Sequence, residues 1–462
     1  MRSDNASISK GVDPVLIWMY LLLVAIGITA IFAVTYREGD PIVASFFSFK
    51  TDYSRQLIFF FVAAVIGVFI LLTDSKFFPA TANVWYAVGM VMLLLVFPFH
   101  SAVKGTESII RFGGFQFQPA ELFKVPVALA LAKYLSRVDM DFSKTRSQLI
   151  ATAIAIAPAL ITIMQKETGL ALVYFSFFLV MYREGLPPMI LIIGFSIAVL
   201  VIATIIIEPN TLAIVITLIA GLVVLANRRQ IKRRKSRLVT IILIWLLTVG
   251  VQRFAVPFIF QHVLQKHQVE RIFSLFGKDN PYSKVPSELA LATRAWEEAE
   301  ELRSRAEESV LELQKLRNEY NVRQSKIAIG SGGLLGKGLL SGTQTRYDFV
   351  PEQRTDFIFC TIGEGFGFVG TSILLIIYGV LLFRIIMVAE RQRSVFSRCY
   401  AYGVAAVFFF HIAINVSMTV GLAPVIGIPL PLVSYGGTAL LTFTILLFIL
   451  IRLDADRQMV LR

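Results

Sequence analysis

The sequence predicts an all-α, polytopic integral membrane protein, a bundle of about twelve transmembrane helices with a large extracytoplasmic loop. Hydrophobic residues make up 56% of the 462 residues and charged residues only 16%, with a mean hydropathy of +0.71, so polar surface is too scarce to cover a soluble globule. The apolar residues also form long runs, and in hydrocarbon each run must satisfy its own backbone hydrogen bonds, as a helix does. Alternating strands of about ten residues are absent from the sequence, which excludes a transmembrane β-barrel.

Twelve apolar segments predict the helices in order along the chain. Several lie at the short end of the roughly 17–25 residues that span a bilayer. The fifth and sixth segments form a tight hairpin interrupted by polar residues 165–169, and a charged break between two spans usually lines a cavity. The segments run approximately over 15–35, 56–73, 80–99, 118–134, 149–164, 169–183, 188–207, 211–227, 238–256, 356–386, 397–420 and 431–452.

The formal charge of +13 is explained by loops rather than by a nucleic-acid partner. Lysine and arginine concentrate in 228–237, 384–398 and 452–462, and with twelve spans all three loops fall on one side. Positive loops face the cytoplasm, so both termini are expected there, and the first span can direct insertion without a signal peptide. Outside these membrane flanks no basic patch carries interleaved aromatic residues, so nucleic-acid binding is not expected.

This topology divides the chain into three parts. Residues 1–256 are N-terminal transmembrane helices, 257–355 form the large extracytoplasmic loop, and 356–462 are C-terminal transmembrane helices. The loops at 100–119 and 422–431 fall on the same outer face. Because loops held by a rigid scaffold often carry function, we expect the functional residues on this face.

Within the large loop, residues 287–320 predict one inserted amphipathic helix. The segment lacks Gly and Pro, is rich in Ala, Glu, Leu and Arg, and repeats apolar residues every three to four positions from Leu289 to Leu316. Pairs such as Glu301 and Arg305 occupy its polar face. The apolar stripe needs a cover, either the protein's own outer surface or a partner protein.

The glycine-rich segment 327–338 suggests a phosphate cradle but is not a Walker loop. Ser331 stands at the first glycine position, and Gly338 replaces the Ser or Thr that would hold magnesium. Two interpretations stay open: the glycines let backbone approach a head group or a re-entrant helix, or their role is purely conformational.

Ionisable residues within apolar segments are the main pointers to function, because each costs at least ~2.5–3.5 kcal/mol to insert into a membrane. Glu121 and Lys124 lie three apart at the start of the fourth span, so they share a helix face and can neutralise one another. Glu167 lies in the hairpin break, and Asp356 and Glu364 are eight apart on one predicted face. Together they predict a functional cleft of mixed charge in the outer half of the bundle, rather than isolated structural ion pairs.

Several blocks of sequence carry a resemblance to a known family. They are Gly113–Glu121 with Lys124, Gln165–Leu172, Gln324–Gly333, Gly342–Thr345, Phe349–Glu352, Thr355–Phe359, and Gly427–Pro431 with Ser434–Gly437. In order and spacing they resemble the SEDS family of shape, elongation, division and sporulation proteins, its RodA branch more closely than its FtsW branch. The likeness extends over most of the chain, and jointly the blocks are highly specific.

The resemblance implies a peptidoglycan glycosyltransferase in the inner (plasma) membrane of a bacterial cell. Such an enzyme joins lipid II units into glycan strands on the outer surface during cell elongation and cell-shape maintenance. Its expected partner is a class B penicillin-binding protein of the elongation complex, within the membrane lipids. The family core has ten helices, so 188–256 would hold two extra spans, which preserve the sidedness of the active loop.

The resemblance also implies that an outer-loop aspartate deprotonates the acceptor sugar hydroxyl, while undecaprenyl diphosphate leaves. In the family this aspartate directly precedes a proline, and here the sequence is Lys278-Asp279-Asn280-Pro281. Strict alignment puts Asn280 at the catalytic position, but an amide cannot act as a general base. Asp279 is therefore the predicted catalytic residue, with a shift of one position.

The leaving diphosphate needs cationic neighbours, for which Lys124, Arg271 and Lys326 are predicted, or a divalent cation such as Mg or Mn. The sequence does not identify ligands for that metal, and no other cofactor is expected. Its two cysteines and four histidines lack the spacing of a disulfide or a metal site. The predicted substrate-binding residues are Glu121, Lys124, Gln165, Glu167, Arg271, Lys326, Gln344, Glu352, Asp356 and Ser434.

Three other functions stay open. A transporter that flips lipid II would also need many spans and charged midplane residues, although the sequence lacks an evident repeated half. A division polymerase of the FtsW branch would share the chemistry, and an inactive scaffold would only recruit the penicillin-binding protein. Substitution of Asp279 separates the enzyme from the transporter, whose activity would depend on charges deep in the spans.

Overall fold

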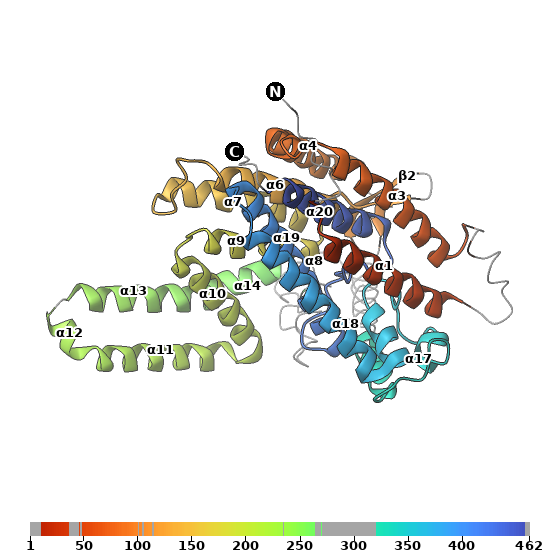
Figure 1. Ribbon diagram of the computed structural model, residues 1–462. Coiled ribbons are helices and arrows are strands. Elements are labelled where there is room, and N and C mark those ends of the chain that lie inside the picture. Colours follow the sequence, from red (N-terminus) through yellow and green to blue (C-terminus); the bar gives the residue numbers. More distant parts are fainter. Residues whose placement is uncertain are drawn as a thin grey trace, which may run out of the picture. The chain divides into compact units, whose positions relative to one another are not determined.

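The computed structural model describes residues 11–36, 46, 49–99, 101–103, 106–112, 115–233, 235–263, 269 and 320–457 (Figure 1). By contacts, the chain divides into two compact units, one formed by 1–187 with 321–462 and the other by 188–320. The predicted boundaries at 256 and 356 separate membrane spans from the extracytoplasmic loop rather than compact units from one another. They stay a prediction.

Among the described residues, nine helices are long and apolar enough to cross a membrane. Each coincides with one of the predicted segments, because a long apolar run specifies a helix wherever lipid is the solvent. The nine are α1 (Pro14–Thr35), α3 (Asp52–Leu72), α4 (Phe77–Phe99), α7 (Thr145–Met164), α11 (Pro209–Ala226), the continuous helix Ser236–His262, α18 (Ile358–Glu390), α19 (Val395–Val420) and α20 (Gly437–Ala455).

The three remaining predicted segments are also helical, and two of them are interrupted. The segment 118–134 is split into α5 (Pro119–Leu122) and α6 (Lys124–Leu135). The segment 169–183 is split into α8 (Thr168–Tyr174) and α9 (Phe177–Arg183), and α10 is Pro188–Ile206. All twelve predicted segments are therefore helices, and the predicted fold class is confirmed.

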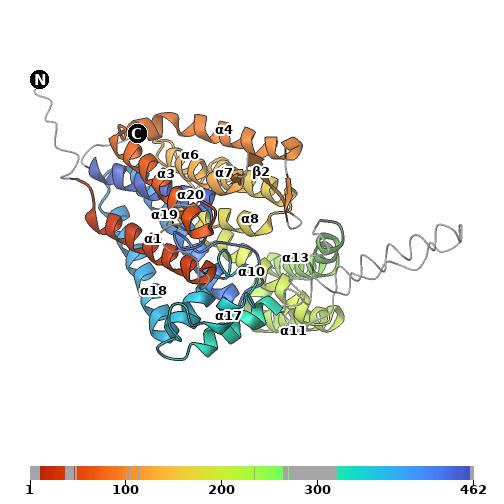
Figure 2. The same cartoon turned by 90° about the vertical axis from the view of Figure 1, so that its right-hand side faces the viewer.

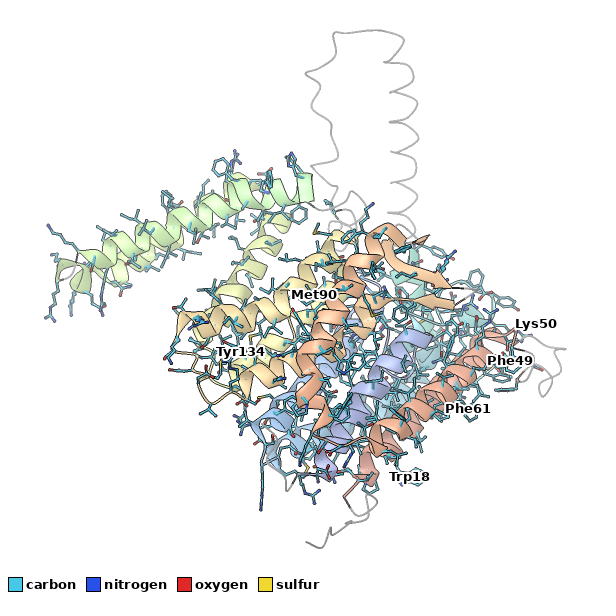
Figure 3. All side chains as sticks on the ribbon, turned by 90° about the horizontal axis from the view of Figure 1, so that it is seen from above. Trp18, Phe49, Lys50, Phe61, Met90 and Tyr134 are labelled. Atoms are coloured by element: carbon cyan, nitrogen blue, oxygen red, sulfur yellow. The ribbon has the colours of Figure 1, made fainter. Side chains whose placement is uncertain are left out.

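The centre of the first unit is formed by α19 and α20, most of whose residues are buried. Helix α20 packs against α3, and α19 packs against α6 and α18 (Figure 2). A glycine allows another close approach, between α4 and the junction of α5 and α6: a Cβ on Gly89 of α4 would lie 2.1 Å from the Phe123 ring. The outer surface is apolar, and Trp18 and Phe61 point away from the bundle (Figure 3).

A small antiparallel sheet occupies the predicted outer loop 100–119. Its strands are β1 (Ser101–Val103), β2 (Thr106–Phe112) and β3 (Phe115–Phe117), in the order β1-β2-β3. In the register of the second pair, Ile110 lies opposite Phe117. The sequence predicts only a loop here, because strands this short carry too few residues to show a period of two.

The glycine-rich segment packs directly on α18. A Cβ on Gly332 would lie 2.0 Å from the carbonyl oxygen of Gly363, and one on Gly336 would lie 2.2 Å from that of Gly365. The N–H of Lys337 donates to the carbonyl of Glu364 over 3.0 Å. At least two of these glycines thus allow backbone-to-backbone packing on α18, a predicted membrane span, while an approach to a head group or a re-entrant helix stays a prediction.

Helix α18 is kinked where this packing ends. Gly367 adopts φ 65° and ψ −159° inside the helix, a conformation that L side chains avoid. The N–H of Phe368, which follows the kink, donates instead to the carbonyl of Gly333 over 2.8 Å. The glycine-rich segment therefore accepts a hydrogen bond that the kinked helix does not form internally.

An ionic network joins the start of α1 to the ends of α18 and α20. Arg391 donates to Asp13 over 2.8 Å and, through its Nε, to Asp454 over 2.8 Å. Arg384 also donates to Asp13, over 3.0 Å, and Gly11 packs against the backbone of Ala455 at the end of α20. The carboxylates of Asp13 and Asp454 are buried, so these contacts satisfy charges that water does not reach.

The second unit contains α10, α11, α12 (Arg228–Arg233) and α13 (Ser236–Gly250). Two π-helical turns, Val251–Ala255 and Ile259–Val263, flank α14 (Val256–Phe258). Helices α11 and α13 form a hairpin with α12 between them, visible in Figure 1. The predicted inserted helix 287–320 lies outside the described residues, apart from residue 320.

Candidate functional site

Three side chains form a buried charged cluster where α5 meets α6. The Lys124 ammonium donates to Glu121 Oε2 over 2.6 Å and to His411 Nε2, from α19, over 2.8 Å. All three side chains are buried, and Lys124 and His411 are 0% exposed. An ammonium can only donate, so His411 Nε2 is the acceptor and the ring proton sits on Nδ1. The predicted pairing of Glu121 with Lys124 is present in the structure, and His411 extends it.

The loop between α19 and α20, residues 421–436, connects this cluster to the other predicted residues. His411 Nδ1 donates to the carbonyl of Pro429 over 3.1 Å. One helical turn further along α19, Asn415 Nδ2 donates to the carbonyls of Ile428 and Asp356, over 2.7 and 2.8 Å. Two buried polar side chains of one helix thus fix the loop and the turn that precedes α18.

Ser434 holds the same loop from its other end. Its hydroxyl donates to the carbonyl of Thr355 over 2.6 Å and accepts from the N–H of Leu430 over 2.8 Å. Both hydrogen bonds are internal to the fold, so the described geometry gives Ser434 a loop-positioning role. Neighbouring Arg354 forms an ion pair with Asp52 at the start of α3.

Asp356 and Glu352 lie in the turn before α18, not on the helix. Because α18 begins at Ile358, the helical spacing predicted between Asp356 and Glu364 does not apply. The Asp356 carboxylate faces the 421–436 loop, where a Cβ on Gly427 would lie 3.4 Å from its Oδ2. Glu352 adopts φ 58°, a strained conformation for a side-chain-bearing residue, and accepts from Thr355 Oγ1 over 3.2 Å.

The hairpin break places Glu167 and Gln165 inside the first unit. Lys166 between them adopts φ 65°, which turns the chain sharply from α7 into α8. Gln165 Nε2 donates to the carbonyl of Leu93 over 2.7 Å, and Glu167 Oε2 accepts from Ser108 of β2 over 2.9 Å. Two residues on, a Cβ on Gly169 would lie 2.3 Å from the Ile426 carbonyl oxygen, so this break also meets the 421–436 loop.

Glu364 anchors the glycine-rich segment from within α18. Its buried carboxylate accepts from the N–H groups of Gln344 and Thr345, each over 2.9 Å, and from the Lys337 ammonium over 3.0 Å. Charge-assisted bonds of this kind are about twice as strong as neutral ones. Gln344 therefore takes part through its backbone, while its side-chain Oε1 is buried without a partner among the described residues.

Of the remaining predicted residues, one is exposed and the others lie outside the described part of the chain. Lys326 is exposed, and its side chain passes close to Gly421, where a Cβ would lie 2.3 Å from Lys326 Cε. Asp279, Asn280 and Arg271 lie outside the described residues. Within the described ranges, no group of three or more His, Cys, Asp or Glu side chains could hold a metal ion.

A cavity of about 620 Å³ lies away from this cluster. Its lining includes Leu135, at the far end of α6 from Lys124, together with Asp141, Glu184 and Arg398. Glu184 and Arg398 are paired over 2.8 Å, so the cavity has a polar wall of its own. The loops that line this cavity are predicted from the charge pattern to face the cytoplasm. The cavity is separate from the predicted site.

Sequence reasoning missed His411 and Asn415. They are four apart in an otherwise apolar span, with Thr419 four further on, so the three share one helix face. All three are buried in the structure. This spacing of polar residues every four positions in an apolar span is the sequence signal that marks them.

Polar side chains of α19 thus hold the 421–436 loop, Lys124 reaches that loop through His411, and Asp356 faces it from the turn before α18, inside a bundle of apolar helices. This arrangement defines an integral membrane protein with a built polar interior. The chain belongs to the FtsW, RodA and SpoVE family of cell cycle proteins, whose family model matches residues 14–285 and 301–459.

Similar proteins occur in bacteria. The peptidoglycan glycosyltransferase MrdB of Escherichia coli K12 is 26% identical over 398 residues, which cover 85% of this chain and 84% of that relative. The peptidoglycan glycosyltransferase RodA of Treponema pallidum is 27% identical over 459 residues, covering 96% and 97%. A solved chain from a study of polymerization and crosslinking by a peptidoglycan synthase complex shares the fold, with a TM-score of 0.61, 20% identity, and 96% and 98% of the two chains covered.

Proposed function

We propose that this protein is a peptidoglycan glycosyltransferase that polymerises lipid II into glycan strands during cell elongation and cell-shape maintenance. Its relatives over nearly the whole chain are named for this activity. The structural observation that carries the proposal is a buried polar network: Lys124, paired with Glu121, reaches the 421–436 loop through His411, and the Asp356 carboxylate faces the same loop. Ionisable groups are costly inside a membrane bundle, so a shared polar interior of this extent indicates a substrate site.

In the proposed reaction Asp279 takes the proton of the acceptor sugar hydroxyl. The hydroxyl oxygen then forms a bond with the anomeric carbon of the donor, and the bond from that carbon to the diphosphate breaks. Undecaprenyl diphosphate departs with the electron pair, and the proton stays on the aspartate. A sugar hydroxyl is a weak nucleophile, so a carboxylate within hydrogen-bond reach is the group that the step needs.

The charge that develops on the leaving diphosphate needs positive neighbours. Lys326 is exposed and Arg271 lies in the proposed active loop, so both are proposed as direct contacts. Lys124 is fully buried and bound to Glu121 and His411, which supports a role in positioning the loop within the same site. The other predicted substrate residues, including Gln165, Gln344, Glu352 and Ser434, are proposed to lie at the substrate site, and the hydrogen bonds described above hold their backbone or side chains in place.

A divalent cation, Mg or Mn, is part of the proposal as an aid to the leaving diphosphate. Since the described residues do not assemble a cluster of metal ligands, no step is assigned to it. Chelation with EDTA followed by addition of each metal tests the requirement. Activity that is unchanged after chelation would remove the cation from the proposal.

The proposed setting is the bacterial plasma membrane, with both termini cytoplasmic and the loop 257–355 outside. A class B penicillin-binding protein of the elongation complex is the proposed partner. The fold shared with a chain from a peptidoglycan synthase complex supports this partner. The basic loops 228–237, 384–398 and 452–462 support the orientation.

The experiment is synthesis of glycan polymer from purified lipid II by the full chain in detergent, with the penicillin-binding protein added. We expect polymer from the wild type and none from Asp279→Ala, whereas Asn280→Ala keeps activity. Loss with Asn280→Ala alone would move the catalytic position by one residue. Absence of polymer from the wild type, with lipid II crossing vesicle membranes, would favour the transporter; absence of both, with partner binding intact, would favour the scaffold.

A further inference from the structure

The arginines in two of the three basic loops are largely neutralised within the fold. In 384–398, Arg384 and Arg391 bind Asp13, and Arg398 binds Glu184 over 2.8 Å. In 452–462, Arg452 pairs with Asp456 over 2.8 Å. These arginines are held by carboxylates, so much of their charge is unavailable to other partners.

The third loop differs. Residues 228–237 contain seven Lys and Arg in ten positions, and no Asp or Glu occurs from 209 to 269. Six of the seven cations are described, and all six are exposed: Arg228, Arg229, Lys232, Arg233, Lys235 and Arg237. Within the described part of the chain, none of the six side chains forms an ion pair. The tip of the α11–α13 hairpin is therefore a dense patch of unneutralised positive charge.

The helices on either side of this tip are exposed and apolar. Large side chains such as Leu218 and Leu222 of α11 and Leu243 and Leu247 of α13 are each more than 60% exposed within the fold. The two helices are nevertheless joined, because Trp245 Nε1 donates to Thr217 Oγ1 over 3.0 Å. The hairpin is thus a paired element whose outward surface is suited to lipid.

The length of the hairpin puts the tip at the depth of lipid head groups. Helix α11 has 18 residues, and at about 1.5 Å per residue it spans roughly 27 Å, close to the ~30 Å of a hydrocarbon core. Cations directly beyond such helices lie beside the phosphates of the cytoplasmic leaflet, and clusters of four to eight are typical of sites for anionic lipids. Arginine adds bidentate geometry toward phosphate oxygens.

We infer that the tip of the α11–α13 hairpin, residues 228–237, is a binding site for the phosphate head groups of anionic phospholipids. The uniform positive charge, the lack of local carboxylates and the lipid-exposed helices on both sides favour a membrane lipid over a soluble phosphate. The site is independent of the proposed transferase activity, since no residue of the proposed active site takes part.

Lipid retention by the full chain tests this inference. The protein is reconstituted in vesicles of phosphatidylcholine and phosphatidylglycerol and extracted gently, and its bound lipids are quantified by mass spectrometry. We expect phosphatidylglycerol to be enriched on the wild type. The variant R228Q/R229Q/K232Q/R233Q should lose this enrichment, so that it retains phosphatidylglycerol no better than phosphatidylcholine.

A matched control removes four exposed cations from other loops of the same predicted side, in the variant K76Q/K144Q/R146Q/R393Q. It should keep the enrichment, as should R228K/R229K/R233K, which preserves both the charge and the topology signal. If the fourfold tip variant does not insert, R228Q/R229Q replaces it and should lower the enrichment.

The inference would be overturned if the tip variants retained phosphatidylglycerol like the wild type, if the control variant lost as much as the tip variant, or if the wild type showed no enrichment. A wash with inorganic phosphate, compared with sodium chloride of equal ionic strength, separates the two sources of phosphate. Selective release by inorganic phosphate would assign the tip to a soluble ligand instead.

Discussion

Lys124 and His411 are 287 positions apart in the chain, and a hydrogen bond of 2.8 Å between their side chains joins α6 to α19. The same imidazole holds the carbonyl of Pro429 through its other nitrogen. A neutral histidine therefore relays the position of a buried ammonium to the loop on which the polar interior converges.

Replacement of His411 by Phe should destabilise the protein by about 1–3 kcal/mol, because Lys124 and the Pro429 carbonyl would each lose a partner. Thermal unfolding in detergent measures the loss, and the glycan-synthesis assay should show lower activity. His411→Gln, which can accept and donate, should recover part of both. Equal behaviour of the Phe and Gln variants would argue against the relay.

Replacement of Lys124 by Met leaves the buried Glu121 carboxylate without its cation and should cost about 3–5 kcal/mol. The double variant Glu121→Gln/Lys124→Met removes the stranded charge as well, so it should be more stable than Lys124→Met alone. A comparison of melting temperatures for both single variants and the double variant completes the cycle. Strictly additive losses would mean that the two side chains are not coupled.

Gly332→Ala should reduce stability and loosen the glycine-rich segment, since its new methyl group would meet the Gly363 carbonyl at 2.0 Å. Gly330→Ala is the matched control, because a Cβ there meets nothing within 4 Å. Hydrogen exchange of residues 331–345 measures the difference. Similar protection in the two variants would contradict the close packing on α18.

Glu364→Gln should weaken the anchoring of the same segment by about 1–3 kcal/mol, as the amide cannot accept all the hydrogen bonds that the carboxylate accepts. Exchange of the N–H groups of Gln344 and Thr345 should accelerate. Glu208→Gln, at an exposed position in the second unit, is the control and should change neither stability nor exchange.

The ionic network at Asp13 predicts a dependence of stability on pH. Burial raises the pKa of this carboxyl, but the guanidinium groups of Arg384 and Arg391 outweigh burial and hold the pKa below its ordinary value. A lowered pKa means that the contribution is complete above the ordinary aspartate value of about 3.9 and disappears as the pH falls through the folded value. Melting temperatures measured from neutral to acidic pH should therefore fall less steeply for Asp13→Asn than for the wild type.

The helices could be predicted from the sequence because each long apolar run is a local signal, and all twelve runs are helical. The Glu121–Lys124 pair could also be predicted from local sequence, since three-residue spacing places both side chains on one helix face. The partners of that pair were not predictable in this way. His411 comes from α19, and nothing in the spacing of α5 and α6 identifies the helix that packs against them.

The sheet and the turn at Asp356 were missed for related reasons. Strands β1 and β3 have three residues each, too few for a periodic pattern, and their pairing is set by hairpins. The start of α18 depends on backbone hydrogen bonds near Glu352 and Thr355, which local spacing does not reveal. The predicted helix therefore began at Asp356, two residues before the observed start at Ile358. The role of Asp279 stays a prediction, since that residue lies outside the described ranges.

The network of Asp13, Arg391 and Asp454 has a consequence for biogenesis. Its three members come from the beginning of the chain and from its last two hundred residues, with the whole second unit encoded between them. During translation Asp13 emerges first and stays without its arginines until α18 has been made, and Asp454 arrives last. The first unit can therefore complete this network only when synthesis is almost finished. A chain truncated before α20 would leave the early helices in the bilayer without the contacts of Asp454.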